Sequence, residues 1–287
     1  MQRETKAHYL EAINRAVEFI ESNIAQNIGL AEIAKYSFLS KYHFHRIFKS
    51  IIGDTTKDYL TRLRLEKSAI MLKNTTKTIN QISYDCGYGS PETFMRAFKS
   101  FFSTTPTLYR ASTKTEIANK KRRYQNTSFE TLHVGSPQII EKPNLNLAYI
   151  RQFGNYDKID QSFERLFQWA SENFTLKQQP EALGIVHDNL DLTEVSNLRF
   201  DACIVVPEEI QTSGEIGFKK IKGGKFAVFH YKGAFEMFYP IYDYIYNVCI
   251  FKYRWVLRDE PALEWYTSPP PFYNSQQLIT DFYLPIV

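Results

Sequence analysis

The chain has 287 residues, which is enough for about two domains. Hydrophobic residues make up 44% of it and charged residues 23%, a globular composition that excludes disordered and low-complexity proteins. The formal net charge of +4 conceals a split, because residues 1–125 hold 21 Lys and Arg against 11 Asp and Glu, whereas residues 126–287 hold 14 against 20. A basic half joined to an acidic half indicates that only the first half meets a polyanion.

Signals for membranes, disulfides and metals are missing from the sequence. No apolar run approaches the roughly 18 to 20 residues of a membrane-spanning helix, and residues 1–6 lack the apolar stretch of a secretory signal. Cys86, Cys203 and Cys249 lie far apart and form no Cys-x-x-Cys spacing. We therefore expect a cytoplasmic protein with buried thiols, no membrane partner, no metal site and no cofactor.

The first half has the periodicity of amphipathic helices. Apolar side chains recur at helical spacing over residues 7–24, and Gly29 follows as a stop signal. A second long helix is predicted over residues 58–73, with its charged side chains in solvent, namely Arg62, Arg64, Glu66 and Lys67.

An internal repeat with an offset of 50 residues organises this half. Residues 44–50 (FHRIFKS) align with residues 94–100 (FMRAFKS). Each copy is predicted as a short helix, a tight turn and a second helix, with short helices at 30–36 and 79–85 and second helices at 41–51 and 91–101. Candidate N-caps precede three of these helices, at Ser40, Thr78 and Ser90, and the run Thr78-Ile79-Asn80-Gln81 has the pattern of a capping box. This is the geometry that lets a second helix enter the DNA major groove.

The two second helices each divide into an inward and an outward face. Apolar residues at i, i+3, i+4 and i+7 should be buried: Phe44, Ile47, Phe48 and Ile51 in the first, and Phe94, Ala97, Phe98 and Phe101 in the second. The outward stripes are then Tyr42, His45, Arg46 and Lys49, and Glu92, Met95, Arg96 and Lys99. Arg can bridge the O6 and N7 atoms of guanine, and Lys can reach phosphate. A solvated charged face is the alternative for either helix alone, but the repetition in a basic half favours DNA contact.

At these residues the sequence resembles the DNA-binding domain of AraC-type transcription regulators, over residues from about 8 to 112. The resemblance implies an all-α domain with two helix-turn-helix units joined by a linker helix. It also implies that both second helices enter successive major grooves of double-stranded DNA. The expected contact residues are the two outward stripes with Lys41 and Ser90 at the helix starts.

A linker is predicted between the two halves. Residues 114–127 contain Lys120-Lys121-Arg122-Arg123 and almost no large apolar side chain, so they cannot bury a core. We therefore expect a DNA-binding domain at 1–113, a linker at 114–128 and a second domain at 129–287. The linker cations are further candidates for phosphate contact.

The second half contains a duplication of its own. Residues 148–156 align with residues 227–235 at an offset of 79, and residues 182–186 align with residues 262–266 at an offset of 80. Each copy reads as strand, helix, strand, strand, with helices near 157–173 and 235–248. The sequence therefore predicts an α+β domain made of two like units with a ligand cleft between them.

Glu264 breaks the symmetry of this duplication, because it stands where the first copy has Gly184. If Leu263 and Trp265 face the helices, strand alternation places Glu264 and Tyr266 on the opposite face, toward the cleft. A carboxylate removed from water needs a partner, and aromatic neighbours favour an organic cation. An ordinary solvent-facing glutamate on an edge strand is the equal alternative.

Residues from about 130 to 287 resemble the GyrI-like effector-binding domain. The supporting motifs are Tyr149 to Tyr156, Leu198 to Cys203, Pro261 to Tyr266 and Thr280 to Pro285. The resemblance implies that Glu264 contacts the effector and that aromatic side chains line its pocket. The candidates for that lining are Tyr149, Tyr156, Phe235, Trp265, Tyr266 and Tyr283.

We therefore expect a transcription regulator, not an enzyme, that binds double-stranded DNA, a small hydrophobic or cationic effector and RNA polymerase. No metalloprotease, P-loop, dinucleotide or nucleophile-elbow motif is present, so no catalytic residue is assigned. Two alternatives stay open for the second half. One is hydrolysis of a small hydrophobic molecule, which members of the GyrI-like group suggest, and the other is a module for protein interaction alone.

Overall fold

The computed structural model describes residues 2–124, 129, 132–154, 156–174, 179–189, 191–211, 214–267 and 277–287. The chain forms two compact units, Met1–Asn119 and Lys120–Val287. The described residues include no helix that is long and apolar enough to cross a membrane.

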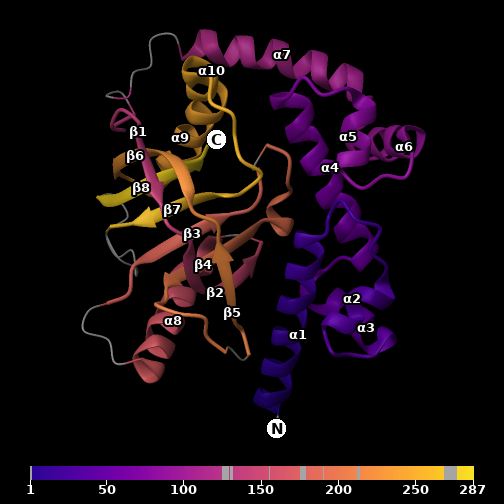
Figure 1. Ribbon diagram of the computed structural model, residues 1–287, viewed down its shortest axis with the longest axis vertical. Coiled ribbons are helices and arrows are strands. Elements are labelled where there is room, and N and C mark those ends of the chain that lie inside the picture. Colours follow the sequence, from indigo (N-terminus) through magenta and orange to yellow (C-terminus); the bar gives the residue numbers. More distant parts are fainter. Residues whose placement is uncertain are drawn as a thin grey trace. The chain divides into compact units, whose positions relative to one another are not determined.

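The first unit is entirely helical, as predicted. Two short helices are each followed by a turn and a second helix, at the bounds that the repeat predicts to within one residue (Figure 1). In chain order the helices are α1 (Gln2–Ser22), α2 (Leu30–Tyr36), α3 (Lys41–Ile52), α4 (Thr56–Asn74), α5 (Ile79–Asp85), α6 (Pro91–Phe102) and α7 (Pro106–Arg123).

Helix capping differs between the two repeats. Thr78 and Gln81 form a reciprocal capping box at α5, and the Ser90 hydroxyl accepts a hydrogen bond from the backbone N–H of Thr93 at α6. Ser40 makes no such side-chain bond at α3. The capping box and the Ser90 cap are therefore confirmed, whereas α3 begins without the cap expected from Ser40.

The same kind of aromatic ring pair packs each second helix against the helix that follows it. Phe48 of α3 packs edge-on against Tyr59 of α4 at 5.6 Å between ring centroids. Phe98 of α6 packs in the same way against Tyr109 of α7 at 5.4 Å. Phe101 is 43% exposed, because Phe102 takes the inward place against Phe98 and Tyr109. The expected burial of Phe101 is therefore wrong by one residue.

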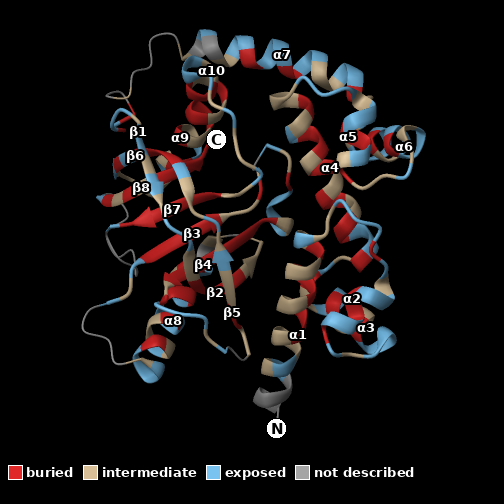
Figure 2. Ribbon diagram, in the orientation of Figure 1, coloured by how far each residue is buried: buried red, intermediate tan, exposed pale blue. Residues whose placement is uncertain are grey.

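The charged side chains of α4 also depart from prediction. Arg62 and Glu66 are buried instead of exposed, and they lie 3.7 Å apart. Arg62 also pairs with Asp54 at 3.4 Å. Because α4 connects the two repeats, it is covered on more sides than an amphipathic surface helix, and Figure 2 shows it mostly as buried or half-buried.

The second unit is built on one eight-stranded antiparallel sheet in the order β1-β6-β8-β7-β3-β4-β2-β5. Its central strands are buried, which Figure 2 shows in red. The strands are β1 (Gln138–Lys142), β2 (Leu145–Phe153), β3 (Ala182–Val186), β4 (Arg199–Val205), β5 (Ile216–Ile221), β6 (Gly224–Gly233), β7 (Ala262–Tyr266) and β8 (Leu278–Pro285).

The predicted duplication appears as two strand-helix-strand-strand copies joined edge to edge. The first copy contributes β2, β3 and β4, and the second contributes β6, β7 and β8. The two copies meet where β3 pairs with β7, in a register that places Gly184 directly opposite Glu264. The position that breaks the sequence symmetry therefore lies on the seam between the copies.

Helices cover one face of this sheet. In chain order they are η1 (Tyr156–Lys158), α8 (Ile159–Asn173), η3 (Phe235–Met237), α9 (Phe238–Tyr244), the π-helix η4 (Ile245–Cys249) and α10 (Ile250–Tyr253), with a further short turn, η2 (Val195–Asn197), in a connection. Side chains of α8, α9 and α10 form one core with inward residues of the strands. A second cluster, which includes Leu147, Tyr149, Leu263 and Trp265, lies on the opposite face.

The segment predicted as a linker is largely helical in its described part. Residues 114–123 continue α7, where Thr113 and Ile117 are buried, and residues 125–128 lie outside the described residues. Helix α7 therefore runs from the first unit to the start of the second. All three cysteines are buried, and they form no disulfide in the described part of the chain.

A buried ionic cluster on the face opposite the helices ties β2, β4 and β5 together. Both carboxylate oxygens of Asp201 accept hydrogen bonds from Arg151, at 2.6 and 2.9 Å, and Lys219 lies 2.5 Å away. His187 Nε2 lies 2.8 Å from the same carboxylate. Burial alone would raise the pKa of Asp201, but Arg151, Lys219 and His187 together hold it well below its ordinary value.

We predict that Asp201→Asn lowers the free energy of unfolding of the second unit by about 3 to 5 kcal/mol, because it leaves buried cations without their counter-charge. All three tryptophans lie in this unit, so urea denaturation followed by tryptophan fluorescence reports on it alone. Asp281→Asn is the matched control. Asp281 occupies the equivalent position of the second copy, and its partner His230 is mostly exposed. Equal losses in the two variants would contradict the assigned role of the cluster.

Candidate functional site

The outward stripe of α3 is exposed along its length. Tyr42 is 84% exposed, and Lys41, Arg46 and Lys49 are exposed as well, whereas His45 is half-buried. The inward positions Phe44 and Phe48 are fully buried. The division of this helix into two faces therefore follows the predicted periodicity.

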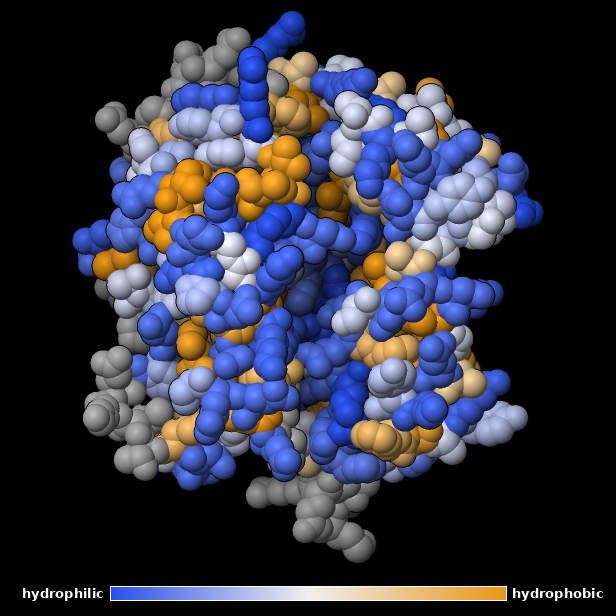
Figure 3. Space-filling view, viewed as in Figure 1, coloured by the Kyte–Doolittle hydropathy of each residue, from blue (hydrophilic) through white to orange (hydrophobic). Residues whose placement is uncertain are grey.

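The second stripe, on α6, has the same arrangement. Glu92, Met95, Arg96 and Lys99 are all exposed, and Ser90 serves as the N-cap of the helix. Figure 1 shows α3 and α6 on the same side of α4, and Figure 3 shows hydrophilic side chains gathered over α6. The first unit thus presents two cation-bearing helices, and their contact with DNA stays a prediction.

Glu264 is buried on the seam of the second unit, with 4% of its surface exposed. Tyr266 belongs to the core on the helix-covered face, together with Phe163 of α8, whose ring it meets at 5.7 Å. Leu263 and Trp265 lie on the opposite face. The strand alternation was therefore right and its orientation wrong, since Glu264 and Tyr266 point toward the helices. The alternative of a solvent-facing glutamate on an edge strand is also excluded.

The carboxylate of Glu264 has hydroxyl groups as its neighbours. The Tyr266 hydroxyl donates to Oε2 at 2.5 Å. Burial raises the pKa of Glu264 to about 7, although the hydroxyls of Tyr266 and Tyr242 each act to lower it. This carboxylate therefore changes charge near neutral pH, and the groups that lower its pKa are tyrosine hydroxyls.

Gly184 makes this arrangement possible. A Cβ atom at this position would lie 2.6 Å from the Tyr266 hydroxyl and 2.4 Å from the ring of Phe200. Contacts this short do not occur in folded proteins, so a side chain here would displace Tyr266 from Glu264. The glycine and the glutamate, which face each other across the seam, therefore form one structural unit.

Tyr242 and Tyr246 of the α9–η4 helix are two further aromatic residues near Glu264, and neither is among the predicted lining residues. The Tyr242 hydroxyl is buried and faces Glu264, yet it makes no hydrogen bond of ordinary geometry within the described residues. Tyr246 stacks on Tyr242 at 6.2 Å. Tyrosines, in place of leucine or phenylalanine, at an inward helical stripe were the signal that marked these positions.

The predicted lining residues divide between the two faces of the sheet. Tyr156 and Phe235 lie with Tyr266 on the helix-covered side, and Glu264 influences the pKa of Tyr156. Tyr149, Trp265 and Tyr283 belong to the cluster on the opposite face. The structure therefore brings Tyr156, Phe235 and Tyr266 to the side of Glu264, and it separates the other three from that carboxylate.

The three separated aromatics already have cations beside them. Lys219 lies 4.2 Å from the ring centre of Tyr149, and Lys142 lies 4.4 Å from Trp265 and 5.6 Å from Tyr283. Such cation–π contacts are stabilising in desolvated surroundings. These residues therefore act in the structure as a packed, cation-covered face of the sheet.

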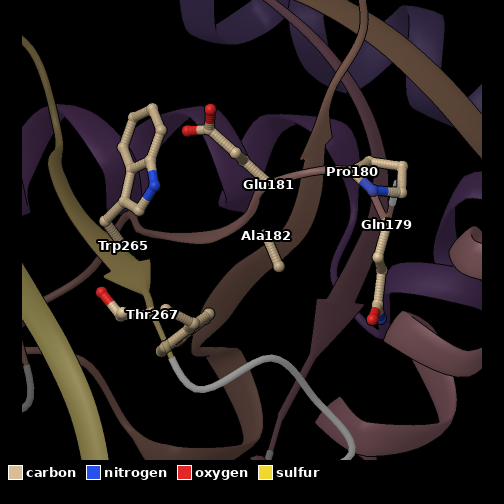
Figure 4. A pocket seen from close by; sticks show the side chains of 7 residues that line it. Gln179, Pro180, Glu181, Ala182, Trp265 and Thr267 are labelled. Atoms are coloured by element: carbon tan, nitrogen blue, oxygen red, sulfur yellow. The ribbon is translucent and has the colours of Figure 1, made fainter. Parts of the chain in front are cut away.

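A cavity of about 300 Å³ lies where β3 begins and β7 ends. Its lining consists of Gln179, Pro180, Glu181, Ala182, Trp265, Tyr266 and Thr267 (Figure 4). Tyr266 both lines this cavity and donates to Glu264. Tyr266 therefore belongs both to the lining of the cavity and to the surroundings of the Glu264 carboxylate. The described residues contain no cluster of His, Cys, Asp and Glu that could hold a metal ion.

Family comparisons match both halves of the chain. Residues 136–287 match the family of the GyrI-like small molecule binding domain. Residues 33–112 match a helix-turn-helix domain family. The two matches coincide with the sheet unit and with the pair of helix-turn-helix repeats.

Individual relatives resemble the first half. The chain is 31% identical over 117 residues to the transposon Tn10 TetD protein of Escherichia coli, which is 41% of this chain and 85% of TetD. It is 38% identical over 96 residues to the transcriptional regulator Rob of Salmonella typhimurium, so that the match spans only a third of either protein. A solved transcriptional regulator from Chromobacterium violaceum, described as AraC-type, is 31% identical and covers 36% of this chain and 91% of its own, with a TM-score of 0.34.

We predict that Glu264 makes the second unit less stable as pH rises. Its folded pKa of about 7 lies above the ordinary 4.5, so the folded state keeps a proton that the unfolded state releases between these values. Relative to Glu264→Gln, the wild type should lose about 3 kcal/mol of unfolding free energy between pH 4 and pH 8. Urea titrations with tryptophan fluorescence measure this difference, and Glu209→Gln, at an exposed ion pair, is the control. A pH-independent difference would show that Glu264 titrates normally.

Proposed function

Because this chain belongs to the AraC-type regulators that carry a GyrI-like small molecule binding domain, we propose that its control molecule is a hydrophobic cation bound beside Glu264. The protein is a DNA-binding transcription regulator controlled by a small molecule. The observation that carries the proposal on its ligand is the buried carboxylate with tyrosine hydroxyls as its neighbours.

The ligand chemistry follows from the cost of burying a charge. A carboxylate taken from water is stable as an anion only if a cation or several donors compensate it. Tyr266 and Tyr242 offer hydroxyls and aromatic rings but no positive charge. A cation with apolar substituents supplies the missing charge and meets the ring faces through cation–π attraction.

The DNA interface that we propose consists of the stripes on α3 and α6. Arg46 and Arg96 occupy equivalent positions, and we assign them to guanine edges. Lys49 and Lys99 are assigned to phosphates, Glu92 to cytosine, and Tyr42 and Met95 to thymine methyl groups. Lys41, His45 and Ser90 complete the interface at its margins.

Lys120 does not belong to this interface. Its ammonium group is held by Asp243 at 2.5 Å and by Asp191 at 3.3 Å, within the second unit. The earlier expectation that the linker cations reach phosphate therefore does not extend to Lys120. The neighbouring Arg122 is exposed.

We further propose that the second unit senses its ligand and does not transform it. The matched relatives named above include a transcriptional regulator. We therefore propose that this protein acts in the cytoplasm with RNA polymerase as a partner. A near-neutral carboxyl pKa is also a property of general bases, so ester hydrolysis is the competing activity. Turnover of hydrophobic esters that Glu264→Gln abolishes would favour hydrolysis over sensing.

We predict that Arg46→Ala and Arg96→Ala each cost about 1 to 3 kcal/mol of binding free energy at a cognate site selected from random DNA. Each should also relax base preference at one position, because a guanine contact is lost. Fluorescence anisotropy on cognate and random duplexes measures both effects.

Lys49→Ala should weaken binding to both duplexes alike and make that binding less dependent on salt concentration. Arg165→Ala, in an exposed pair of the second unit, is the control. Equal losses on both duplexes for the arginine variants would assign them to phosphate.

We predict that tetraphenylphosphonium raises the melting temperature of the second unit, because it binds the folded state alone. Binding should weaken about tenfold from pH 8 to pH 6, since Glu264 with a pKa of about 7 gains a proton over this range. Glu264→Gln should lose both the affinity and its pH dependence. The neutral triphenylphosphine oxide is the matched ligand, and equal binding of the two compounds would contradict the requirement for a cation.

A further inference from the structure

Two consecutive residues of α9 face different partners. The side chain of Tyr242 packs on Phe282 of β8 at 5.1 Å, and its hydroxyl faces Glu264. Asp243 is also buried, but its carboxylate contacts Lys120 and Tyr124 instead. Helix α9 therefore touches the candidate effector site with one residue and the end of α7 with the next.

The carboxylate of Asp243 receives three side-chain donors. Lys120 Nζ lies 2.5 Å from Oδ1, the Tyr124 hydroxyl lies 2.6 Å from Oδ2, and Asn247 Nδ2 lies 2.8 Å from Oδ1. Hydrogen bonds to an ionised, buried acceptor are about twice as strong as neutral ones. The contact therefore fixes the end of α7 to α9 more firmly than a surface ion pair would.

We call the contacts of Asp243 and Asp191 with Lys120 and Tyr124 the clamp, and Asp191 is its second carboxylate. Asp191 lies 3.3 Å from the Lys120 ammonium group and accepts a hydrogen bond from the Tyr239 hydroxyl. Tyr239 is one helical turn before Asp243 on α9. Burial alone would lower the pKa of Lys120, but the hydrogen bond with Asp243 and the charge of Asp191 raise it above its ordinary value. Lys120 is therefore held charged between two points of contact with α9.

The clamp acts on the last turn of α7 (Pro106–Arg123). Lys120 and Tyr124 are four residues apart, so they lie on one face of that turn. The earlier turns of α7 belong to the first unit, which ends at Asn119, and Tyr109 of α7 packs on Phe98 of α6. One continuous helix thus carries the clamp at one end and contacts the second outward-stripe helix at the other.

The helix that bears Asp243 continues into a π-helical turn. The π-helix η4 (Ile245–Cys249) begins two residues after Asp243, and Asn247 within it donates to both the carboxylate and the main-chain carbonyl of Asp243. Single π turns within α-helices are frequent at functional sites. Conversion of this turn to an α turn changes the helical register around Asn247, and so alters the donors of Asp243.

We propose that Asp243 transmits occupancy of the Glu264 site to the DNA-binding unit through the clamp on α7. An effector beside Glu264 engages Tyr242, shifts α9, and thereby changes the hold of Asp243 and Asp191 on Lys120 and Tyr124. A ligand acts in this way only by binding the two arrangements of α9 unequally. The transmission step rests on the proposed function, because it needs an effector beside Glu264. The contacts of the clamp do not depend on any effector.

The clamp is tested without ligand by hydrogen–deuterium exchange of the full-length protein. Asp243→Asn keeps the shape of the side chain and removes its charge, so amides of residues 116–124 should exchange about tenfold faster, a change typical of one lost charged hydrogen bond. Tyr124→Phe keeps the ring that packs on Tyr244 at 5.3 Å, and it should give a smaller increase in the exchange rate. This variant provides the test if Asp243→Asn folds poorly. Glu209→Gln, at an exposed pair, is the control and should change nothing. Wild-type exchange of α7 in both clamp variants would overturn the proposal.

The transmission is tested with tetraphenylphosphonium and the selected cognate DNA. In the wild type the cation should change DNA affinity at least about fivefold, the lower end of ordinary coupling between sites. Asp243→Asn should bind the cation within about threefold of the wild type but show less than a twofold change in DNA affinity. A response equal to that of the wild type would overturn the role of Asp243. Failure of the wild type to bind the cation would contradict the proposed effector class, and the exchange experiment would still decide the clamp.

Discussion

A carboxylate enclosed by protein, with hydroxyl groups in place of a cation, constrains the whole second unit. Glu264 sits where the two copies of the duplication join, and its charged form is costly because water is excluded. Position 184 must be a glycine so that the Tyr266 hydroxyl can reach Glu264. Helix α9 must place Tyr242 beside the same carboxylate. The raised pKa of Glu264 and the need for a glycine at position 184 are consequences of placing one acid at this seam.

Two other buried acids of the unit have cationic partners within the chain. Asp201 receives Arg151, Lys219 and His187, and Asp243 receives Lys120. Their charges are compensated within the chain, so they fasten strands and helices together. Glu264 differs from them, because the side chains that donate to its carboxylate are tyrosine hydroxyls. This contrast separates a binding group from structural ones more clearly than burial alone does.

Local periodicity was sufficient to predict the helices of the first unit, because the contacts of that unit are local and occur twice. The repeat located both short helices to the residue, and the capping box at Thr78 followed from spacing alone. Phe101 was misplaced because Phe102 at its side is equally apolar, and only packing against Tyr109 chooses between them. Arg62 and Glu66 were misplaced because a helix that connects two repeats is covered on several sides.

The second unit was less readable because its site depends on contacts between distant segments. Alternation along β7 was visible in the sequence, but the side that α8 and α9 would cover was not. For that reason Tyr149, Trp265 and Tyr283 were grouped with Glu264, although the sheet lies between them. The partnership of Asp243 with Lys120 joins residues 123 positions apart, and no local pattern signals it.

The antiparallel seam also bears on the origin of the unit. Two identical chains related by a twofold axis through the β3–β7 ladder would place the same residue opposite itself at its centre. Such a homodimer has either two glycines there or two acids in mutual repulsion. A lone glutamate facing a glycine therefore requires two halves of different sequence, and this chain carries both halves in one polypeptide.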